Sequence, residues 1–415
     1  MLKIATLYII LLTIPSISYT EEIWTLENSV QQAISVSPLV FAAKEEINSR
    51  KAALSQAGAW PNPTLEIGGS NKLGIDDGKG GHELTNISIS QPIPLGRLSV
   101  QRKKANADLK SANYNHFYQQ LLQENIAAYR FHELQLAKAN FNLAKEQLKF
   151  VNYYQKNKEN IDSLVRYLNN LDRKRLDIMR EISEQNVASA EGEYSEALSN
   201  FRALLNLSQD SSSTTTQLKV ADLSETLINL LNVQNENHPA IATAKYKKKA
   251  ADAQISIERN KRFPDLKIKL YREKDLLGGR RQEFNGVMVD LTFPLWNFNN
   301  GGISKAIADT YKTGYELDAL RRNFQAELRQ TYLHLKHVIK QAEHHRTRIL
   351  SPAKEIFILT QKSFATGEVT ILSLIDANNT YFEARKRYLD LLYESWTETA
   401  NLRLAAGLSL LNIQE

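Results

Sequence analysis

The chain contains no cysteine. Disulfide bonds, thiolate metal sites, a cysteine nucleophile and a lipid anchor on an N-terminal cysteine are therefore excluded. No segment after residue 20 approaches the roughly 18 uninterrupted apolar residues that a membrane-spanning helix requires. If the mature chain crosses a membrane, it must do so as a closed β-barrel.

Helix-breaking residues are missing from a long central stretch, because no glycine or proline occurs between Gly96 and Gly192. This predicts helices of some 60 residues, about 90 Å long at 1.5 Å per residue. Apolar residues recur there every seven positions, in two stripes about 200° apart, which indicates packing on two different neighbours. The first stripe is Leu122, Tyr129, Leu136, Leu143 and Phe150, the second is Leu134, Phe141 and Leu148, and a later stretch repeats the spacing with Leu328, Leu335, Ala342, Ile349 and Ile356, interrupted by Pro352.

A strong charge imbalance is also lacking. The formal net charge is +6, and basic groups such as Lys247–Lys249 lie within predicted helices. A solvated helix face is the simplest reading of such groups, so we expect no nucleic-acid partner.

The first 20 residues have the features of a secretory signal peptide. Lys3 is the only charge, an apolar run covers residues 4–14, and Ser18-Tyr19-Thr20 places small residues before a cleavage site at Glu21. The alternative is an uncleaved anchor. Export without cysteine is typical of a Gram-negative envelope protein.

The chain repeats itself about 200 residues apart. Ser37-Pro38, Trp60-Pro61, Pro94-Leu95 and Leu205-Asn206-Leu207-Ser208 return as His238-Pro239, Phe263-Pro264, Pro294-Leu295 and Ala406-Gly407-Leu408-Ser409. Such self-similarity predicts a pseudo-repeat. We therefore divide the chain into a signal peptide (1–20), a first repeat (21–208), a linker (209–222) that contains a Ser/Thr run, and a second repeat (223–415).

Each repeat is predicted to hold one β-hairpin, over about 64–93 and 265–295, followed by long helices over about 97–207 and 302–407. The hairpin segments alternate apolar and polar residues, as strands of a membrane barrel do. A half-buried soluble hairpin alternates in the same way, and the strands alone do not decide between the two. The predicted lipid-facing side chains are Leu65, Ile67, Ile87, Ile89, Leu266, Ile268, Leu270, Val287, Val289, Leu291 and Phe293.

The order of signal peptide, proline-broken helix, hairpin, Pro-Leu corner and long helices, twice over, resembles the outer membrane factors, the TolC-like exit ducts of efflux pumps. The segment Phe364–Ala377 is similar to the family's stretch at the periplasmic tip of the tube. The lack of an anchor cysteine and the compact length look closest to the cobalt–zinc–cadmium efflux subgroup.

The resemblance implies a mainly α-helical fold with a membrane β-barrel, built as a homotrimer. Each chain would add four strands to a twelve-stranded barrel and a third of an α-helical tunnel across the periplasm. It also implies a location in the outer membrane, contact with outer membrane lipid, and docking to a periplasmic adaptor (membrane fusion) protein that binds a proton-driven inner-membrane pump.

Two sites follow from the resemblance. The turn at Thr366, Gly367, Glu368 and Val369 corresponds to an adaptor-docking tip, and Gly367 suits a turn between helices because glycine adopts a positive φ cheaply. Asp376 matches the second of two family aspartates that ring the tunnel's constriction, whereas Ser373 stands at the first position, which puts a double acidic ring in doubt. The corresponding tip of the first repeat, around 160–172, lacks the glycine.

No catalytic or cofactor site is evident. We find no nucleophile elbow, phosphate loop or paired carboxylates in a recognisable context. His334 and His337 have metal-pair spacing, but no acidic residue or cysteine completes an evident set, so no resident metal is predicted.

The sequence thus predicts a passive outer-membrane exit duct for small solutes, with divalent metal cations as the subgroup's cargo. A type I protein-secretion duct and a periplasmic coiled-coil scaffold or adaptor remain alternatives. The scaffold explains the helices but not the alternation in four strands.

Overall fold

The computed structural model describes residues 22–71, 82–156, 170–208, 213–223, 225–277 and 280–412. The predicted signal peptide, the loop at 74–81 and most of the first-repeat tip lie outside these ranges. The chain forms two compact units, which are described separately. One comprises the chain up to residue 36 with 127–221 and 339–397, and the other comprises 37–126, 222–338 and the chain from 398 onward.

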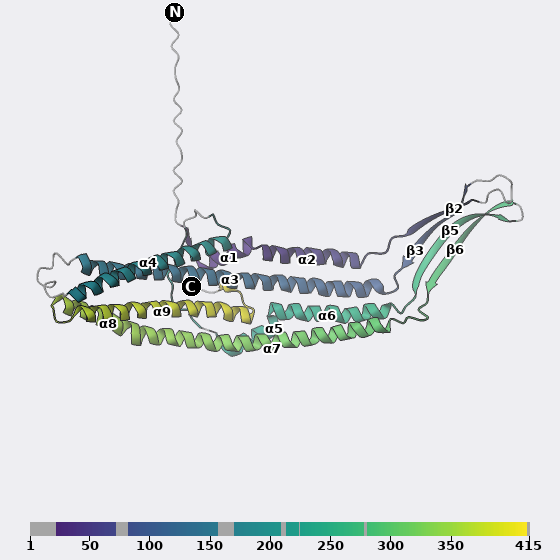
Figure 1. Cartoon of the computed structure of the whole chain (residues 1–415). Helices are drawn as coiled ribbons and strands as arrows, with labels where there is room; N and C mark the ends of the chain where they lie inside the picture. Colours follow the sequence, from purple (N-terminus) through teal and green to yellow (C-terminus); the bar gives the residue numbers. More distant parts are fainter. Residues whose placement is uncertain are drawn as a thin grey trace, which may run out of the picture. The chain divides into compact units, whose positions relative to one another are not determined.

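The second unit contains a four-stranded antiparallel sheet with strand order β2-β3-β5-β6 (Figure 1). The predicted hairpin regions hold its strands: β2 (Thr64–Asn71) with β3 (His82–Ile93), and β5 (Asp265–Leu277) with β6 (Arg280–Thr292). The two hairpins join because β3 pairs with β5, with Ile89 opposite Leu270. Phe293 directly follows β6 rather than lying within it.

Helices α2 (Pro38–Ala57), α5 (Leu227–Asn237), α6 (Pro239–Asn260) and the first part of α7 (Asn300–His345) belong to the same unit, with the start of α3 (Arg97–Lys156). Ala240, Ile241, Leu317 and Phe324 form one of its apolar cores, against which Tyr118 packs. Ser37 and His238 begin α2 and α6 in the same way, since each side chain accepts a backbone N–H before a helix that starts with proline.

The first unit contains α1 (Leu26–Val36), the end of α3, α4 (Asn170–Leu204), α8 (Ser351–Ala365) and most of α9 (Ile371–Ala406). The two predicted stripes of α3 do contact different helices. Phe141 stacks on Tyr194 of α4 at 5.9 Å between ring centroids. On the other stripe, Phe150 lies 5.0 Å from Phe357 of α8. The prediction of two packing seams on one helix is therefore confirmed.

The prediction of a buried stripe from Leu328 to Ile356 is only partly correct. Leu328, Leu335 and Ala342 are buried, but Ile349 and Ile356 are 44% and 54% exposed. A π-helical turn, η2 (Arg346–Leu350), lies between α7 and α8, and the Ser351 N–H bonds the Arg346 carbonyl five residues back.

The same turn shows how the helix accommodates Pro352. In a regular α-helix the proline ring would collide with the carbonyl four residues back, and the wider π turn relieves this. Its extra residue shifts the buried stripe by one position, so Phe357 is buried in place of Ile356. The predicted interruption at Pro352 is therefore a change of register within one continuous helical run.

Part of the predicted linker forms a strand. Ser213–Thr215 forms strand β4, which pairs in parallel with β1 (Glu22–Trp24). The following residues are held by helix side chains: Gln135 Nε2 donates to the Thr216 carbonyl at 2.9 Å, and Trp396 Nε1 donates to the Lys219 carbonyl at 2.8 Å. These bonds to backbone carbonyls fix a segment that its composition alone marked as a linker.

Candidate functional sites

The turn between α8 and α9 is a Schellman motif, as the glycine predicted. Gly367 has a φ of +80°. Its N–H bonds the Phe364 carbonyl at 3.1 Å, and the Glu368 N–H bonds the Ser363 carbonyl at 2.9 Å. Thr366, Gly367 and Glu368 are exposed and Val369 is half-buried. The predicted docking residues thus form one exposed turn of defined geometry.

A small apolar core holds this turn in place. Ile371, Leu374 and Leu176 are buried together, and Phe150, Tyr154, Phe364 and Ile375 pack against them. Because the side chains on both flanks of the turn are fixed by packing, the turn can present Thr366–Val369 with little conformational freedom.

Ser373 and Asp376 lie in the first turns of α9, and both are exposed. Thr370 caps this helix, since its hydroxyl accepts the Ser373 N–H at 3.4 Å and lies 3.3 Å from the Ser373 hydroxyl. Ser373 is therefore engaged in capping. Asp376 follows at i+3, on the same side of the helix.

The sheet has one apolar face. In the register, Leu65, Ile89, Leu270 and Val287 lie opposite one another across all four strands. Of the eleven predicted lipid-facing side chains, only Leu266 is half-buried, and the exposed fraction of the others runs from 38% for Ile87 to 68% for Val287. Side chains directly opposite in a sheet share a face, so this is one continuous exposed apolar surface.

The opposite face of the sheet is polar. Lys269 Nζ pairs with Glu66 at 2.7 Å, and Ser88 Oγ donates to the same carboxylate at 3.4 Å. On this face Tyr271 lies directly opposite Gly286, and a Cβ on Gly286 would come within 2.3 Å of the tyrosine ring. The tyrosine therefore covers the glycine, an arrangement that secures strand register.

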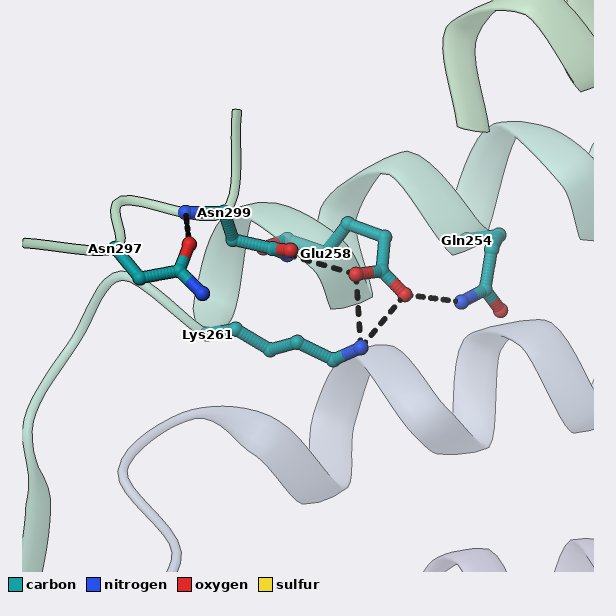
Figure 2. Close-up of polar contacts among 5 residues, drawn as sticks. All are labelled: Gln254, Glu258, Lys261, Asn297 and Asn299. Atoms are coloured by element: carbon teal, nitrogen blue, oxygen red, sulfur yellow. Dashed lines mark hydrogen bonds and ion pairs between the residues drawn. The ribbon is translucent and has the colours of Figure 1, made fainter. Parts of the chain in front are cut away.

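A clamp joins the end of α6 to the corner before α7 (Figure 2). The buried Glu258 carboxylate accepts bonds from Lys261 Nζ at 2.8 Å, Gln254 Nε2 at 2.9 Å and Asn299 Nδ2 at 2.7 Å. Lys261 and then Asn299 lower the pKa of Glu258 by hydrogen bonding to its ionised form. Asn299 in turn takes a positive φ of 54°.

This corner was not foreseen as functional. Arg262 also holds it, donating to the Phe298 carbonyl at 2.9 Å and to Asn300 Oδ1 at 2.6 Å. The available signal was the cluster of aromatic residues around the Pro-Leu corner, Phe293 to Phe298.

Within the described residues, no group of three or more His, Asp or Glu side chains is arranged so that it could hold a metal ion. His334 instead lies 3.4 Å from Glu398. In the same described ranges, no helix is both long enough and apolar enough to cross a membrane.

Comparison with known proteins shows which class the chain resembles. Residues 230–408 match the family model described as outer membrane efflux protein. The fold is that of solved outer membrane channels. It superposes on CusC with a TM-score of 0.74 at 18% identity, covering 92% of both chains, and on open-state MtrE of Neisseria gonorrhoeae with a TM-score of 0.76 at 16% identity, covering 93% of this chain and 89% of that one. The predicted resemblance to outer membrane factors is confirmed, and the outer membrane is the chain's location.

The chain is also similar to metal-resistance proteins. It is 26% identical to the cobalt-zinc-cadmium resistance protein CzcC of Cupriavidus metallidurans over 178 residues, 43% of this chain and 42% of that protein. It is 23% identical to the nickel-cobalt-cadmium resistance protein NccC of Alcaligenes xylosoxydans xylosoxydans over 315 residues, 72% of this chain and 68% of that protein. The match thus spans less than half of CzcC.

Proposed function

We propose that this protein is a passive outer-membrane exit duct that carries small solutes out of the periplasm, without catalysing a reaction. The observation that carries the proposal is the sheet with one exposed apolar face and one polar face. Leaving a Leu, Ile or Val side chain in water rather than burying it costs roughly 1.5–3 kcal/mol. An exposed surface made of many such side chains requires an apolar environment, and lipid supplies it.

We further propose that three copies assemble. Within the described residues, the sheet ends on β2 and β6, each paired on one side only. Unpaired backbone groups in lipid cost several kcal/mol each, and four strands are too few to close a barrel. Three chains with four strands each would close a twelve-stranded barrel and remove every open edge.

The exposed turn Thr366–Val369 is our candidate for docking to a periplasmic adaptor protein, which would connect the duct to an inner-membrane pump. This proposal is supported by the exposure of the turn and by the apolar core around Ile371 and Leu374, which holds it in place. We expect Glu368→Lys to abolish export in cells while the purified protein keeps its conductance. Glu355→Lys is a matched control, because Glu355 is exposed on α8 before the turn. Equal effects of the two changes would contradict docking at the turn.

The proposed cargo is divalent metal cations, supported by the names of CzcC and NccC. Cells that lack the protein should become sensitive to Co²⁺, Zn²⁺ or Cd²⁺ but not to organic antimicrobials. Sensitivity to organic compounds alone would indicate another solute class, and loss of a secreted protein would indicate a type I secretion duct.

The deciding experiment is the mass and conductance of the detergent-purified protein. A trimer that conducts ions in a planar bilayer supports the duct. A non-conducting monomer or dimer that stays folded in plain buffer would overturn it and favour the periplasmic scaffold.

A further inference from the structure

The two repeats differ in length at the corner between the last strand and the long helix. In the first repeat, Ile93-Pro94-Leu95-Gly96 leads into α3, and in the second, Phe293-Pro294-Leu295 is followed by four more residues before α7. Both corners start with the same tight turn, since the Leu95 and Leu295 N–H groups bond the carbonyls of Ile93 and Phe293, each at 3.0 Å.

Both corners also end alike. The residue before the long helix has a positive φ in each, 70° at Gly96 and 54° at Asn299. The second repeat therefore contains three additional residues, Trp296-Asn297-Phe298, between two matched geometries. We name these three residues the corner insertion.

The corner insertion exposes large aromatic side chains. Trp296 is 93% exposed and Phe298 is 52% exposed. Burying a large aromatic side chain normally lowers the free energy of the protein. A group of such side chains left exposed therefore indicates that a partner surface covers them. The neighbouring aromatic residues at the same end of the sheet, Trp60, Phe263 and Phe293, are also 59–61% exposed.

The backbone that carries these rings is fixed. Arg262 holds the Phe298 carbonyl, the Glu258–Asn299 clamp holds the next residue (Figure 2), and the Asn299 N–H bonds Asn297 Oδ1 at 2.9 Å. In the first repeat Gln91 Nε2 likewise donates to the Pro61 carbonyl, next to Trp60, at 2.9 Å. The polar groups of the corner thus form hydrogen bonds within the chain, whereas the aromatic rings remain exposed.

The length of the apolar face identifies the partner. From Val287 in β6 to Phe293 directly after this strand, the outward side chains span six residue steps, about 20 Å along the chain. Because the strands of a barrel are tilted, the height of this apolar face across the membrane is less than its length along the strand. The apolar band of an outer-membrane barrel is about 25 Å tall. At the other end the face becomes charged, with Lys274 3.2 Å from Glu283. The missing apolar height must come from the corner end.

We propose that the corner insertion is a membrane anchor, in which Trp296 and Phe298 lie in the headgroup–acyl boundary of the inner leaflet of the outer membrane. Tryptophan is enriched at this depth because its ring is apolar and its N–H remains hydrogen-bonded to water or headgroups. The inference rests on the proposed function, since it requires the sheet to face lipid.

The test uses the chain's own fluorescence. Of its four tryptophans, Trp60 and Trp296 are exposed, whereas Trp24 and Trp396 are only 7% and 9% exposed. The full-length protein is reconstituted into phospholipid vesicles, and brominated lipids and aqueous iodide are used as quenchers. The variants are Trp60→Phe, Trp296→Phe and the double change, which leaves only the buried pair. These changes at exposed positions keep an aromatic ring and should not impair folding.

We expect lipids brominated near the headgroup to quench Trp296 more than lipids brominated at the chain end, and iodide to quench it little. Trp296→Phe should remove most of this quenching, and the double variant should show almost none. Quenching of Trp296 by iodide but not by brominated lipid would put the insertion in water. Quenching by neither would mean that another copy of the chain covers it. Both results overturn the anchor.

Conductance separates this inference from the proposed function. Vesicles that conduct ions while Trp296 escapes lipid quenching would leave the duct intact and refute the anchor. A deletion of residues 296–298, which gives the second corner the length of the first, should lower the yield of membrane-inserted protein, with Lys305→Ala, at an exposed position of α7, as the control that should not. Equal yields from the two would also refute it.

Discussion

Asn206 and Gly407 occupy equivalent positions at the ends of the two repeats. Each follows a long helix with a positive φ, 54° and 74°. The next residue in each case donates its N–H five residues back, from Leu207 to the Arg202 carbonyl at 2.9 Å and from Leu408 to the Arg403 carbonyl at 2.8 Å. The duplication that the sequence predicted is thus present in backbone geometry, with two different residues meeting one conformational demand.

The two positions should respond differently to substitution. Gly407→Ala places a Cβ 3.0 Å from the His238 backbone in a left-handed conformation, which costs about 1–2 kcal/mol before any clash. Gly367→Ala has the same strain at φ +80° but open space around it, so it should cost less. Asn206→Gly should be nearly neutral. Apparent thermal midpoints by circular dichroism in detergent provide the ranking, and a midpoint of Gly407→Ala at or above that of Gly367→Ala would contradict it.

Gly286 should tolerate no side chain while Tyr271 lies over it. Gly286→Ala must displace the tyrosine ring, and overpacking of this kind costs about 1–3 kcal/mol. The double variant Tyr271→Ala/Gly286→Ala should lose little beyond Tyr271→Ala alone. Gly192→Ala is the control, because Gly192 lies in α4 with open space around it. Thermal midpoints of the unmodified protein, the two single variants and the double variant test the coupling between Tyr271 and Gly286. If the losses of the two single variants simply add in the double variant, there is no such coupling.

Acid should weaken the first unit through His132. This side chain is buried and stacks on Trp396 at 4.8 Å. Burial lowers its pKa from 6.5 to about 4. The folded state therefore binds the proton less readily than the unfolded state, so stability is full above pH 6.5 and declines as the pH falls toward 4. The complete loss amounts to roughly 3 kcal/mol.

The matching variant is His132→Phe, which keeps a ring against Trp396 and cannot titrate. Its stability should depend less on pH between 6.5 and 4 than that of the unmodified protein, as measured by unfolding midpoints across that range. His238, whose pKa burial also lowers to about 4, remains in both proteins. Identical pH profiles would show that His132 does not contribute.

Asp376 offers a test of the proposed constriction. In a trimer, three copies of this exposed carboxylate would form an acidic ring that favours cations. Asp376→Asn keeps the shape and removes the charge, so single-channel recordings should show reduced cation selectivity, and Asp376→Ala should also raise the resting conductance. Asn379→Ala, three residues further along α9, is the control. Unchanged selectivity in Asp376→Asn would remove this residue from the constriction.

The sequence predicted what depends on local periodicity. Alternation located the four strands of the β2-β3-β5-β6 sheet and their apolar face, and a seven-residue spacing located the two seams of α3. Gly367 was recognised because a helix–helix turn has a known local requirement for positive φ. These features are encoded within a few residues, so a single sequence is sufficient to find them.

Contacts between distant residues could not be predicted in this way. Glu258 and Asn299 are 41 residues apart, and Gln135 and Thr216 are 81 apart. Nothing in the composition of either partner identifies the other. The strand at Ser213–Thr215 was missed for the same reason, since a Ser/Thr run has no period and pairs only because β1 lies beside it. The role of Ser373 likewise depends on the neighbouring Thr370 hydroxyl.

The π turn at Arg346–Leu350 shifts the heptad register of the helix by one residue. Before the turn, every seventh residue from Leu328 to Ala342 is buried. After the turn, the buried position is Phe357, one residue later than the heptad predicts. Deleting one residue of this turn would restore the heptad and rotate everything downstream, including α8 and the Gly367 turn, by about 100° around the helix axis. The direction in which the tip presents Glu368 is therefore specified some twenty residues away, by one extra amino acid.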